Sequence, residues 1–318
     1  MKVTEHIESL TNQRSLSIEI IPPLKGGNID DIYNTLYPIM EFSPAFVNVT
    51  YHGEECEYKE LANGFWQRRV LRKRPGTVGI CAAIQNKFKV DAVPHLLCGG
   101  FTKEQTENLL IDLNYLGIEN VVALRGDAPK GELYFRAKED GHPYASHLVK
   151  QIENLNRGIY LDEELENSAQ SDFCIGVAGY PEKHSEAANL DSDIEYLKEK
   201  VDNGASYIIT QLFYDNSKFF AFVDKCRAAG ITIPIIPGLK PFATKRQLHI
   251  IPQRFHVDLP TDLAVEVTKA ASKEAVREVG TEWMIAQSKE LFEAGFHLIH
   301  YYTMGRTEGL CRLAKTLL

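Results

Sequence analysis

The chain has 318 residues, 44% of them hydrophobic, and a formal net charge of -8. A chain of this length can form one large core or two medium ones, and an α/β barrel of this size is commonly one domain. The negative charge argues against nucleic-acid binding, and no apolar run approaches the ~20 residues of a membrane span.

The N-terminal stretch and the cysteines indicate the compartment. His6, Glu8 and Arg14 interrupt the first stretch, so it lacks the apolar core of a secretory signal. The six cysteines are scattered without any C-x-x-C motif, which fits reduced thiols better than disulfides or a zinc site. We therefore expect a soluble, cytoplasmic protein.

Short runs rich in Val and Ile alternate with longer stretches of helical period, as in repeated βα units around a parallel sheet. The predicted strands are residues 16–21, 45–51, 91–97, 120–125, 173–178, 207–212, 233–237 and 297–302. The predicted helices are residues 29–41, 75–86, 102–117, 190–201, 217–229 and 273–294. Eight strands close a barrel, so we predict a (β/α)8 TIM barrel that forms a single domain over residues 1–318. No G-x-G-x-x-G follows a strand, and a Rossmann domain is therefore unsupported.

Two segments are predicted to be surface insertions. Residues 54–74 include five Arg and Lys residues within 68–74, beside Trp66. We interpret this basic run as a solvated helix face, with phosphate binding as the alternative. Residues 154–171 are polar and acidic without a firm period. Neither segment is assigned a role.

The first predicted strand contains a carboxylate among isoleucines and stops at Pro22 and Pro23. Side chains alternate along a strand, so Ile18 and Ile20 share one face and Glu19 lies on the other. A buried carboxylate is costly unless it is paired, protonated or placed at the open end of the strand with a function. The alternative is an edge strand with Glu19 facing water.

Polar residues concentrate at the carboxyl ends of the predicted strands, where a barrel has its active site. These residues are Glu19; Thr50, Tyr51 and His52; His95; Arg125 and Asp127; Tyr180, Glu182 and His184; Thr210 and Gln211; Lys240; and Tyr302, Thr303 and Arg306. Each has a structural explanation by itself, such as a capped turn, but their number favours a large ligand-binding mouth.

The tripeptide Arg125-Gly126-Asp127 places a cation, a close-approach backbone and an anion within one turn. An internal Arg–Asp pair that holds the loop is the alternative. His297 and His300 are three apart on a predicted strand, so they face opposite ways and cannot share a metal ion. Metal catalysis is therefore disfavoured.

These strand ends resemble those of the methylenetetrahydrofolate reductases, which are FAD-containing (β/α)8 barrels. The resemblance runs from about Ser17 to Leu317 and rests on spaced motifs. They are SIEIIPP (17–23), VTY (49–51), PHL (94–96), ALRGD (123–127), YPE (180–182), KVDNGA (200–205), ITQLFYD (209–215), IPG (236–238) and YYT (301–303).

The resemblance implies a set of site residues. Glu19 matches the family's catalytic acid, and Asp127 matches the carboxylate beside the flavin and the pterin. The positions expected to hold FAD are Thr50, Tyr51, His95, Arg125, Gly126, Asp127, Tyr144, Ala145, Tyr180, His184, Asp193 and Lys200. The positions expected to contact the folate are Glu19, Asp127, Gln211, Gln247 and Arg306. Two positions depart from the pattern: Glu199 replaces an arginine common in bacterial members, and an aliphatic residue near Ile251 replaces a ligand-stacking aromatic of some members.

The resemblance also implies the reaction, which is ping-pong reduction of 5,10-methylenetetrahydrofolate to 5-methyltetrahydrofolate by NADH or NADPH through FAD, supplying methyl groups for methionine synthesis. Glu19 would protonate the folate amine and open its ring, with Ile18, Ile20 and Ile21 raising its pKa by desolvation. The expected partners are the folate substrate, the nicotinamide dinucleotide and further copies of the chain in a homo-oligomer. The chain ends soon after the barrel, as expected of the stand-alone bacterial form without the regulatory domain that senses S-adenosylmethionine.

Two alternatives from other classes stay open. A Schiff-base lyase could use Lys240 after the seventh predicted strand. A non-catalytic flavin- or folate-binding protein is the second. The first predicts a colourless protein trapped by borohydride with its substrate, and the second a yellow protein without turnover.

Overall fold

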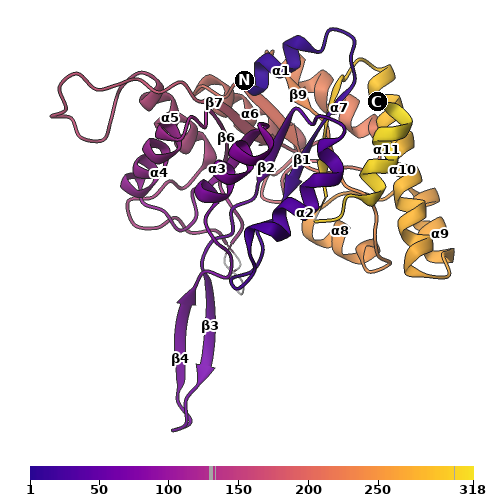
Figure 1. The fold of residues 1–318 in the computed structure, drawn as a ribbon, viewed down its shortest axis with the longest axis horizontal. Coiled ribbons are helices and arrows are strands. Elements are labelled where there is room, and N and C mark those ends of the chain that lie inside the picture. The colour runs from indigo at the N-terminus through magenta and orange to yellow at the C-terminus, as the bar shows by residue number, and fades with distance from the viewer. Residues whose placement is uncertain (129–131, 133, 304) are drawn as a thin grey trace.

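The computed structural model describes residues 1–128, 132, 134–303 and 305–318. Its centre is a parallel sheet of nine strands in the order β10-β11-β1-β2-β5-β6-β7-β8-β9 (Figure 1). The strands are β1 (Ser15–Ile20), β2 (Phe46–Val49), β5 (Asp91–Leu97), β6 (Asn120–Leu124), β7 (Cys174–Gly179), β8 (Tyr207–Thr210), β9 (Ile235–Ile236), β10 (Gly238–Leu239) and β11 (Leu298–Tyr302). The two ends of this order, β9 and β10, are separated by one residue, so the sheet curls into a nearly closed barrel. The predicted (β/α)8 barrel is confirmed.

The seventh barrel position differs from its prediction, because two short strands replace one continuous strand over 233–237. Pro237 lies between β9 and β10 and cannot donate a hydrogen bond to a neighbouring strand. Its carbonyl oxygen accepts from His300 N at 2.9 Å. β9 therefore pairs with β8 and β10 with β11, and this short junction closes the barrel.

Helices cover the outside of the barrel, as Figure 1 shows. They are α1 (Val3–Ser9), α2 (Ile29–Met40), α3 (Thr77–Phe88), α4 (Lys103–Tyr115), α5 (Ala145–Asn156), α6 (Leu190–Asp202), α7 (Asn216–Ala228), α8 (Gln247–Phe255), α9 (Thr261–Lys269), α10 (Lys273–Glu293) and α11 (Glu308–Leu317). The six predicted helices are present, with ends shifted by a few residues. α1, α5, α8, α9 and α11 were not predicted. None of the described helices is long and apolar enough to cross a membrane.

The alternation predicted for β1 is confirmed. Ile18 and Ile20 are buried in the cluster between the sheet and the helices, whereas Glu19 lines a cavity on the other face. β1 pairs with β11 on one side and β2 on the other, so the edge-strand alternative is wrong. At the amino end of the barrel, Val3 of α1 packs on an interior cluster that includes Phe46 and Tyr207.

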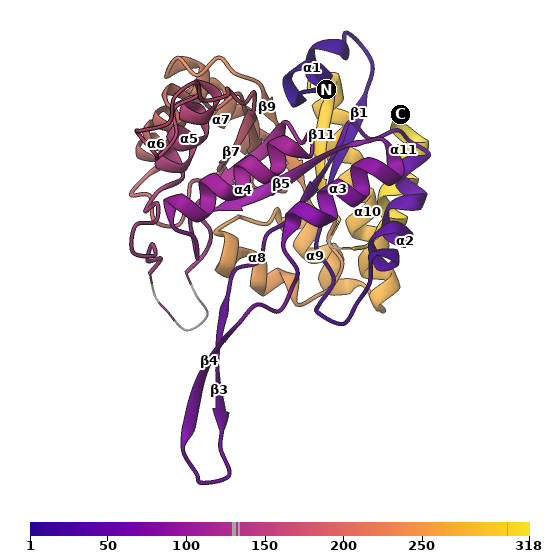
Figure 2. The same cartoon turned by 60° about the vertical axis from the view of Figure 1, so that its left-hand side comes forward.

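Residues 54–74 contradict the predicted helix face. They form an antiparallel hairpin of β3 (Glu55–Glu60) and β4 (Trp66–Leu71), which projects from the barrel in Figures 1 and 2. Two residues of the basic run, Arg68 and Arg69, lie on β4, where they point to opposite faces because strand side chains alternate. Arg72, Lys73 and Arg74 follow the strand. The turn at Gly64 has a φ of 79°, a left-handed conformation that glycine adopts without strain.

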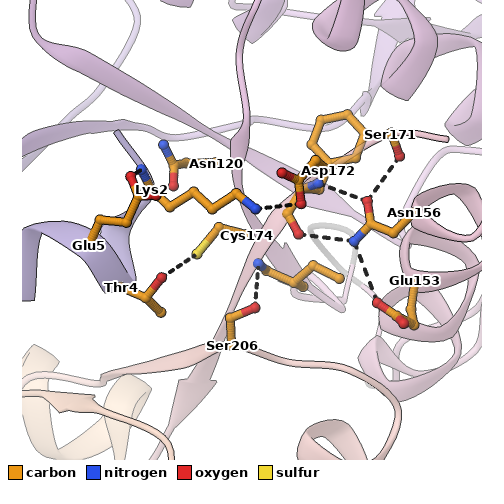
Figure 3. Close-up of polar contacts among 12 residues, drawn as sticks. Lys2, Thr4, Glu5, Asn120, Glu153, Asn156, Ser171, Asp172, Cys174 and Ser206 are labelled. Carbon is orange, nitrogen blue, oxygen red and sulfur yellow. Dashed lines mark hydrogen bonds and ion pairs between the residues drawn. The ribbon is translucent and has the colours of Figure 1, made fainter. Parts of the chain in front are cut away.

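The predicted insertion at 154–171 is only partly an insertion, because its first residues complete α5. Asn156 at the end of α5 ties the two ends of the following loop together, as Figure 3 shows. Its Oδ1 accepts hydrogen bonds from Ser171 Oγ at 2.9 Å and from Phe173 N at 2.7 Å. The loop therefore starts and ends at one fixed point beside the amino end of β7.

Candidate active site

A cavity of about 410 Å³ opens at the carboxyl ends of the barrel strands. Ten of the predicted site residues line it: Glu19, Thr50, Tyr51, His95, Arg125, Gly126, Asp127, Tyr180, His184 and Gln211. A second cavity of about 320 Å³ shares Arg125, Tyr180 and His184 with the first and extends to Tyr144, Ala145, Asp193 and Lys200. The shared lining joins them into one elongated site that runs from the barrel mouth to the start of α5 and along one face of α6.

Glu19 faces the first cavity with a side chain that is 13% exposed. Burial raises the pKa of Glu19 to about 8, and the positive charge of Lys240 partly opposes that rise. The desolvation does not come from Ile18 and Ile20 as predicted, since these side chains point away toward the helices. Ile21 does line the cavity. The barrel interior therefore keeps this carboxyl group protonated at neutral pH.

Two histidines lie near Glu19 without supplying a charge. His95 Nε2 is 3.7 Å from Glu19 Oε2, and burial lowers the pKa of His95 to about 4. Burial likewise lowers the pKa of His300 to about 3, and its Nδ1 is 2.9 Å from Ser17 Oγ. Both rings are therefore neutral near pH 7 and cannot hold Glu19 in its ionised form.

Asn48 and His300 line the cavity but were missed as ligand contacts. Asn48 Nδ2 is 3.3 Å from His95 Nε2. Within the described part of the chain, Asn48 Oδ1 and His300 Nε2 are buried without a hydrogen-bond partner. Buried polar atoms normally have partners, so Asn48 Oδ1 can accept from a bound molecule, and His300 Nε2 can accept from or donate to one. Asn48 could have been found from strand alternation, because it lies two residues before the predicted site residue Thr50 and therefore on the same face.

Lys240 follows β10 and lines the same cavity as Glu19. Its Nζ lies 5.6 Å from the centroid of the Phe255 ring. Burial lowers the pKa of Lys240, and the charge of Glu19 opposes this. Phe255 also lines the cavity and packs against the cluster in which Ile251, one helical turn earlier, is buried with Phe242. An aromatic side chain is thus available at this wall, four residues from the predicted position.

Arg125 is held by a carboxylate, but not by the one considered from the sequence. Its Nη1 and Nη2 donate to the two oxygens of Glu186 at 2.5 and 2.6 Å. Its guanidinium lies 5.0 Å from the centroid of the Phe135 ring. The alternative of an internal Arg125–Asp127 pair is therefore wrong, and Asp127 is exposed at the cavity rim. The hydrogen bonds from Arg125 lower the pKa of Glu186. Sequence reasoning missed Glu186 because it is 61 residues from Arg125 in the chain.

Asp193 and Lys200 lie two helical turns apart on α6 and line the second cavity together. Asp193 Oδ2 accepts from His184 N at 2.8 Å. Lys200 Nζ donates to the Ala178 carbonyl oxygen of β7 at 2.7 Å. Burial lowers the pKa of Lys200 to about 8, opposed mainly by the charge of Asp193. This end of the site therefore offers a cation whose charge depends on pH near neutrality.

Gln247 and Arg306 are not among the described residues that line either cavity. Gln247 Oε1 accepts from Ala243 N at 2.7 Å and Thr244 N at 2.8 Å, so it stabilises the turn before α8. Arg306 is exposed after β11. Their contact with the folate stays a prediction.

The family profile described as methylenetetrahydrofolate reductase matches residues 2–317. The chain belongs to the methylenetetrahydrofolate reductase family. Methylenetetrahydrofolate reductase 1 of Schizosaccharomyces pombe is 37% identical over 310 residues, which are 95% of this chain and 45% of that protein. The 5,10-methylenetetrahydrofolate reductase of Escherichia coli is 29% identical over 318 residues, which are 99% of this chain and 94% of that protein. The chain thus spans about half the length of the eukaryotic family members it matches.

A solved structure of a Clostridium thermocellum protein, which binds two copies of 5-methyl-5,6,7,8-tetrahydrofolic acid, superimposes with a TM-score of 0.58. The two chains are 14% identical, and the match covers 99% of this chain and 98% of the other. At this identity the likeness shows the shared barrel fold alone.

Proposed function

We propose that this protein reduces 5,10-methylenetetrahydrofolate to 5-methyltetrahydrofolate, using FAD and either NADH or NADPH in a ping-pong cycle. Family membership over almost the whole chain supports the folate reaction. The observation that carries the mechanism is Glu19, a buried carboxylic acid in the barrel mouth with a pKa of about 8. The product would supply methyl groups for methionine synthesis in the cytoplasm.

The residues present fit an FAD molecule. The two joined cavities form an elongated site, as an extended dinucleotide requires. Arg125 and Lys200 offer cations for a pyrophosphate, and Tyr180 and His184 lie between the two ends. Asn48 Oδ1 and His300 Nε2 are polar atoms without a partner among the described residues, so they are free to bond the flavin ring in the first cavity. When bound, FAD supplies hydride transfer to and from carbon.

Glu19 supplies the proton that the folate needs. Protonation of the bridging amine breaks one C–N bond of the five-membered ring and leaves an electrophilic iminium carbon, which accepts the hydride. A carboxyl group can donate near pH 7 only if its pKa is raised, and the barrel interior achieves this for Glu19. Asp127 at the rim would accept a hydrogen bond from the pterin, and Gln211 lines the same cavity.

The absorption spectrum of the purified protein, followed by anaerobic reaction, tests the proposal. We expect a yellow protein that NADH or NADPH bleaches and that methylenetetrahydrofolate reoxidises with formation of methyltetrahydrofolate. Bleaching without reoxidation by the folate would contradict the proposed substrate.

The same measurement separates the alternatives. A colourless protein that borohydride traps through Lys240 would support the lyase, whose lysine does line the cavity. A yellow protein that neither substrate affects would support a flavin-binding protein without turnover.

A further inference from the structure

Three neighbouring strands of the barrel, β10, β11 and β1, are in register near their carboxyl ends. Leu239 lies opposite Tyr301, and Tyr301 lies opposite Ile18. These three side chains are buried in the cluster between the sheet and the helices. Side chains alternate along a strand, so the next residue of each strand faces the barrel interior. Those residues, which all line the first cavity, are Lys240, Tyr302 and Glu19.

This shared level places Lys240 and Glu19 on the same wall of the cavity. Neighbouring strands lie about 4.8 Å apart, so the two backbones are about 10 Å apart, with Tyr302 between them. A lysine and a glutamate side chain that extend toward each other can bridge this distance. Tyr302 donates its hydroxyl proton to the Thr210 carbonyl oxygen at 2.6 Å, so that proton is not available to Glu19.

The proposed reaction leaves a negative charge on Glu19. Its proton goes to the bridging amine of the folate, and one C–N bond of the ring breaks with its electron pair retained by that nitrogen. The freed carbon accepts a hydride from the reduced cofactor. The folate gains one proton and one hydride, so its net charge is unchanged. Glu19 therefore starts as a neutral acid and ends as a carboxylate in a cavity whose burial disfavours that charge.

The other titratable side chains of the described cavity lining do not neutralise this carboxylate. Burial lowers the pKa of four histidines, which are neutral near pH 7: His52, His95, His184 and His300. Burial raises the pKa of three tyrosines, which are neutral as well: Tyr51, Tyr180 and Tyr302. Arg125 and Asp127 lie at the end of β6, three strands from β1, and Arg125 donates to both oxygens of Glu186. Lys240 is the remaining lysine or arginine of that lining.

The surroundings of Lys240 suit a cation that faces Glu19. Its Nζ lies 5.6 Å from the centroid of the Phe255 ring, and an aromatic ring attracts a cation without neutralising it. Burial lowers the pKa of Lys240, the charge of Glu19 raises it, and the charge of Arg254 on α8 lowers it. Ionisation of Glu19 therefore favours the charged form of Lys240.

We propose that Lys240 acts through Glu19, as the counter-charge that stabilises the Glu19 carboxylate formed when the folate amine is protonated. This role rests on the proposed folate reduction. It explains why a lysine stands at the interior level of Glu19, where the neighbouring side chains carry no charge.

Infrared titration of the oxidised, flavin-loaded protein tests the pairing without folate. Glu19→Gln identifies the carbonyl band of the protonated acid, which wild type should lose near pH 8. Lys240→Met keeps the length of the side chain and removes its charge, so the loss should move upward by about one pH unit, and Lys240→Arg should restore it. Arg254→Gln removes an exposed charge beside Lys240 and is the matched control, with a smaller shift. Equal titration of wild type and Lys240→Met, or an equal shift in Arg254→Gln, would overturn the pairing.

Stopped-flow reoxidation by methylenetetrahydrofolate at pH 6.5 then tests the role in the reaction. The flavin is reduced beforehand with stoichiometric dithionite, so nicotinamide binding is not involved, and Glu19 is protonated in each Lys240 variant at this pH. Lys240→Met should slow reoxidation at least ~10-fold, because the carboxylate forms without its counter-charge, and Lys240→Arg should recover most of the rate.

The wild-type trace separates the two proposals. Wild-type protein that the folate does not reoxidise would contradict the proposed folate reduction, and the role of Lys240 with it. Normal reoxidation of both wild type and Lys240→Met would overturn the role of Lys240 alone. An unchanged flavin spectrum in each variant shows that folding is intact.

Discussion

The raised pKa of Glu19 comes from burial in the barrel interior, and the positive charge of Lys240 opposes it only in part. Its pKa of about 8 predicts that flavin reoxidation by methylenetetrahydrofolate is level below pH 7 and falls about tenfold per unit above pH 8. Stopped-flow traces between pH 6 and 9.5 measure this. Reduction of the flavin by NADH does not use the acid and should lack that decline.

Glu19→Gln is the control, since the amide keeps the shape but cannot act as the acid. Losing a general acid should slow reoxidation roughly 10²–10⁴-fold, or ~3–5 kcal/mol, with normal bleaching by NADH. Unfolding returns the carboxyl to its ordinary pKa of 4.5, so burying Glu19 costs increasing stability as pH rises from 4.5 toward 8. The variant should therefore gain more in melting temperature at pH 8 than at pH 5. Equal slowing of both half-reactions would assign Glu19 a structural role instead.

Glu186 occupies the Arg125 guanidinium, so in the proposed complex it would compete with the anionic cofactor for that group. An exposed ion pair contributes up to ~1 kcal/mol, so Glu186→Gln should tighten FAD binding by about fivefold. Fluorescence titration of apoprotein with FAD measures the change. Glu199→Gln removes another carboxylate from the second cavity and controls for general charge, so its effect should be smaller. Weaker binding in Glu186→Gln would mean that Glu186 orients Arg125 for the cofactor.

At the scale of elements, α6 presents one face to the second cavity, which is the proposed FAD end of the site. Lys200 Nζ donates to the carbonyl oxygen of Ala178 at the cavity wall, so Lys200→Ala should leave the fold intact and weaken FAD retention. The pKa of about 8 predicts that wild-type retention declines above that pH, whereas the variant should show a flat profile. Lys198→Ala removes a lysine of the same helix that pairs with Asp202, and it serves as the matched control. Stoichiometric FAD in Lys200→Ala after extensive dilution would exclude this role.

At the scale of the whole molecule, closure of the barrel at β10 brings Gly238 close to the Thr210 carbonyl oxygen and to the Tyr302 ring. A Cβ at Gly238 would lie 2.2 Å from the Thr210 carbonyl oxygen and 2.8 Å from the Tyr302 ring. Gly238→Ala should therefore destabilise the protein at the upper end of ~1–3 kcal/mol, seen as a lower urea midpoint with an unchanged slope. Gly79→Ala in α3 meets no heavy atom within 4 Å and should be neutral or stabilising by up to ~1 kcal/mol. Equal midpoints for the two variants would show that the barrel ends can separate.

The sequence pattern by itself determined the strand order, the inward direction of Glu19 and the polar strand ends. Side-chain alternation along a strand and the succession of strands and helices can both be read from residues that are neighbours in the chain. Tertiary structure decided which side chains meet. Glu186 reaches Arg125 across 61 residues of sequence. Gln247 Oε1 accepts from the turn before its own helix. Arg68 and Arg69 of the basic run lie in a strand that pairs with residues 55–60. The raised pKa of Glu19 is likewise set by the closed barrel, since the isoleucines beside it in sequence face the opposite side. Desolvation, ion pairing and strand pairing all depend on distances between residues in space, and the amino-acid sequence does not state those distances.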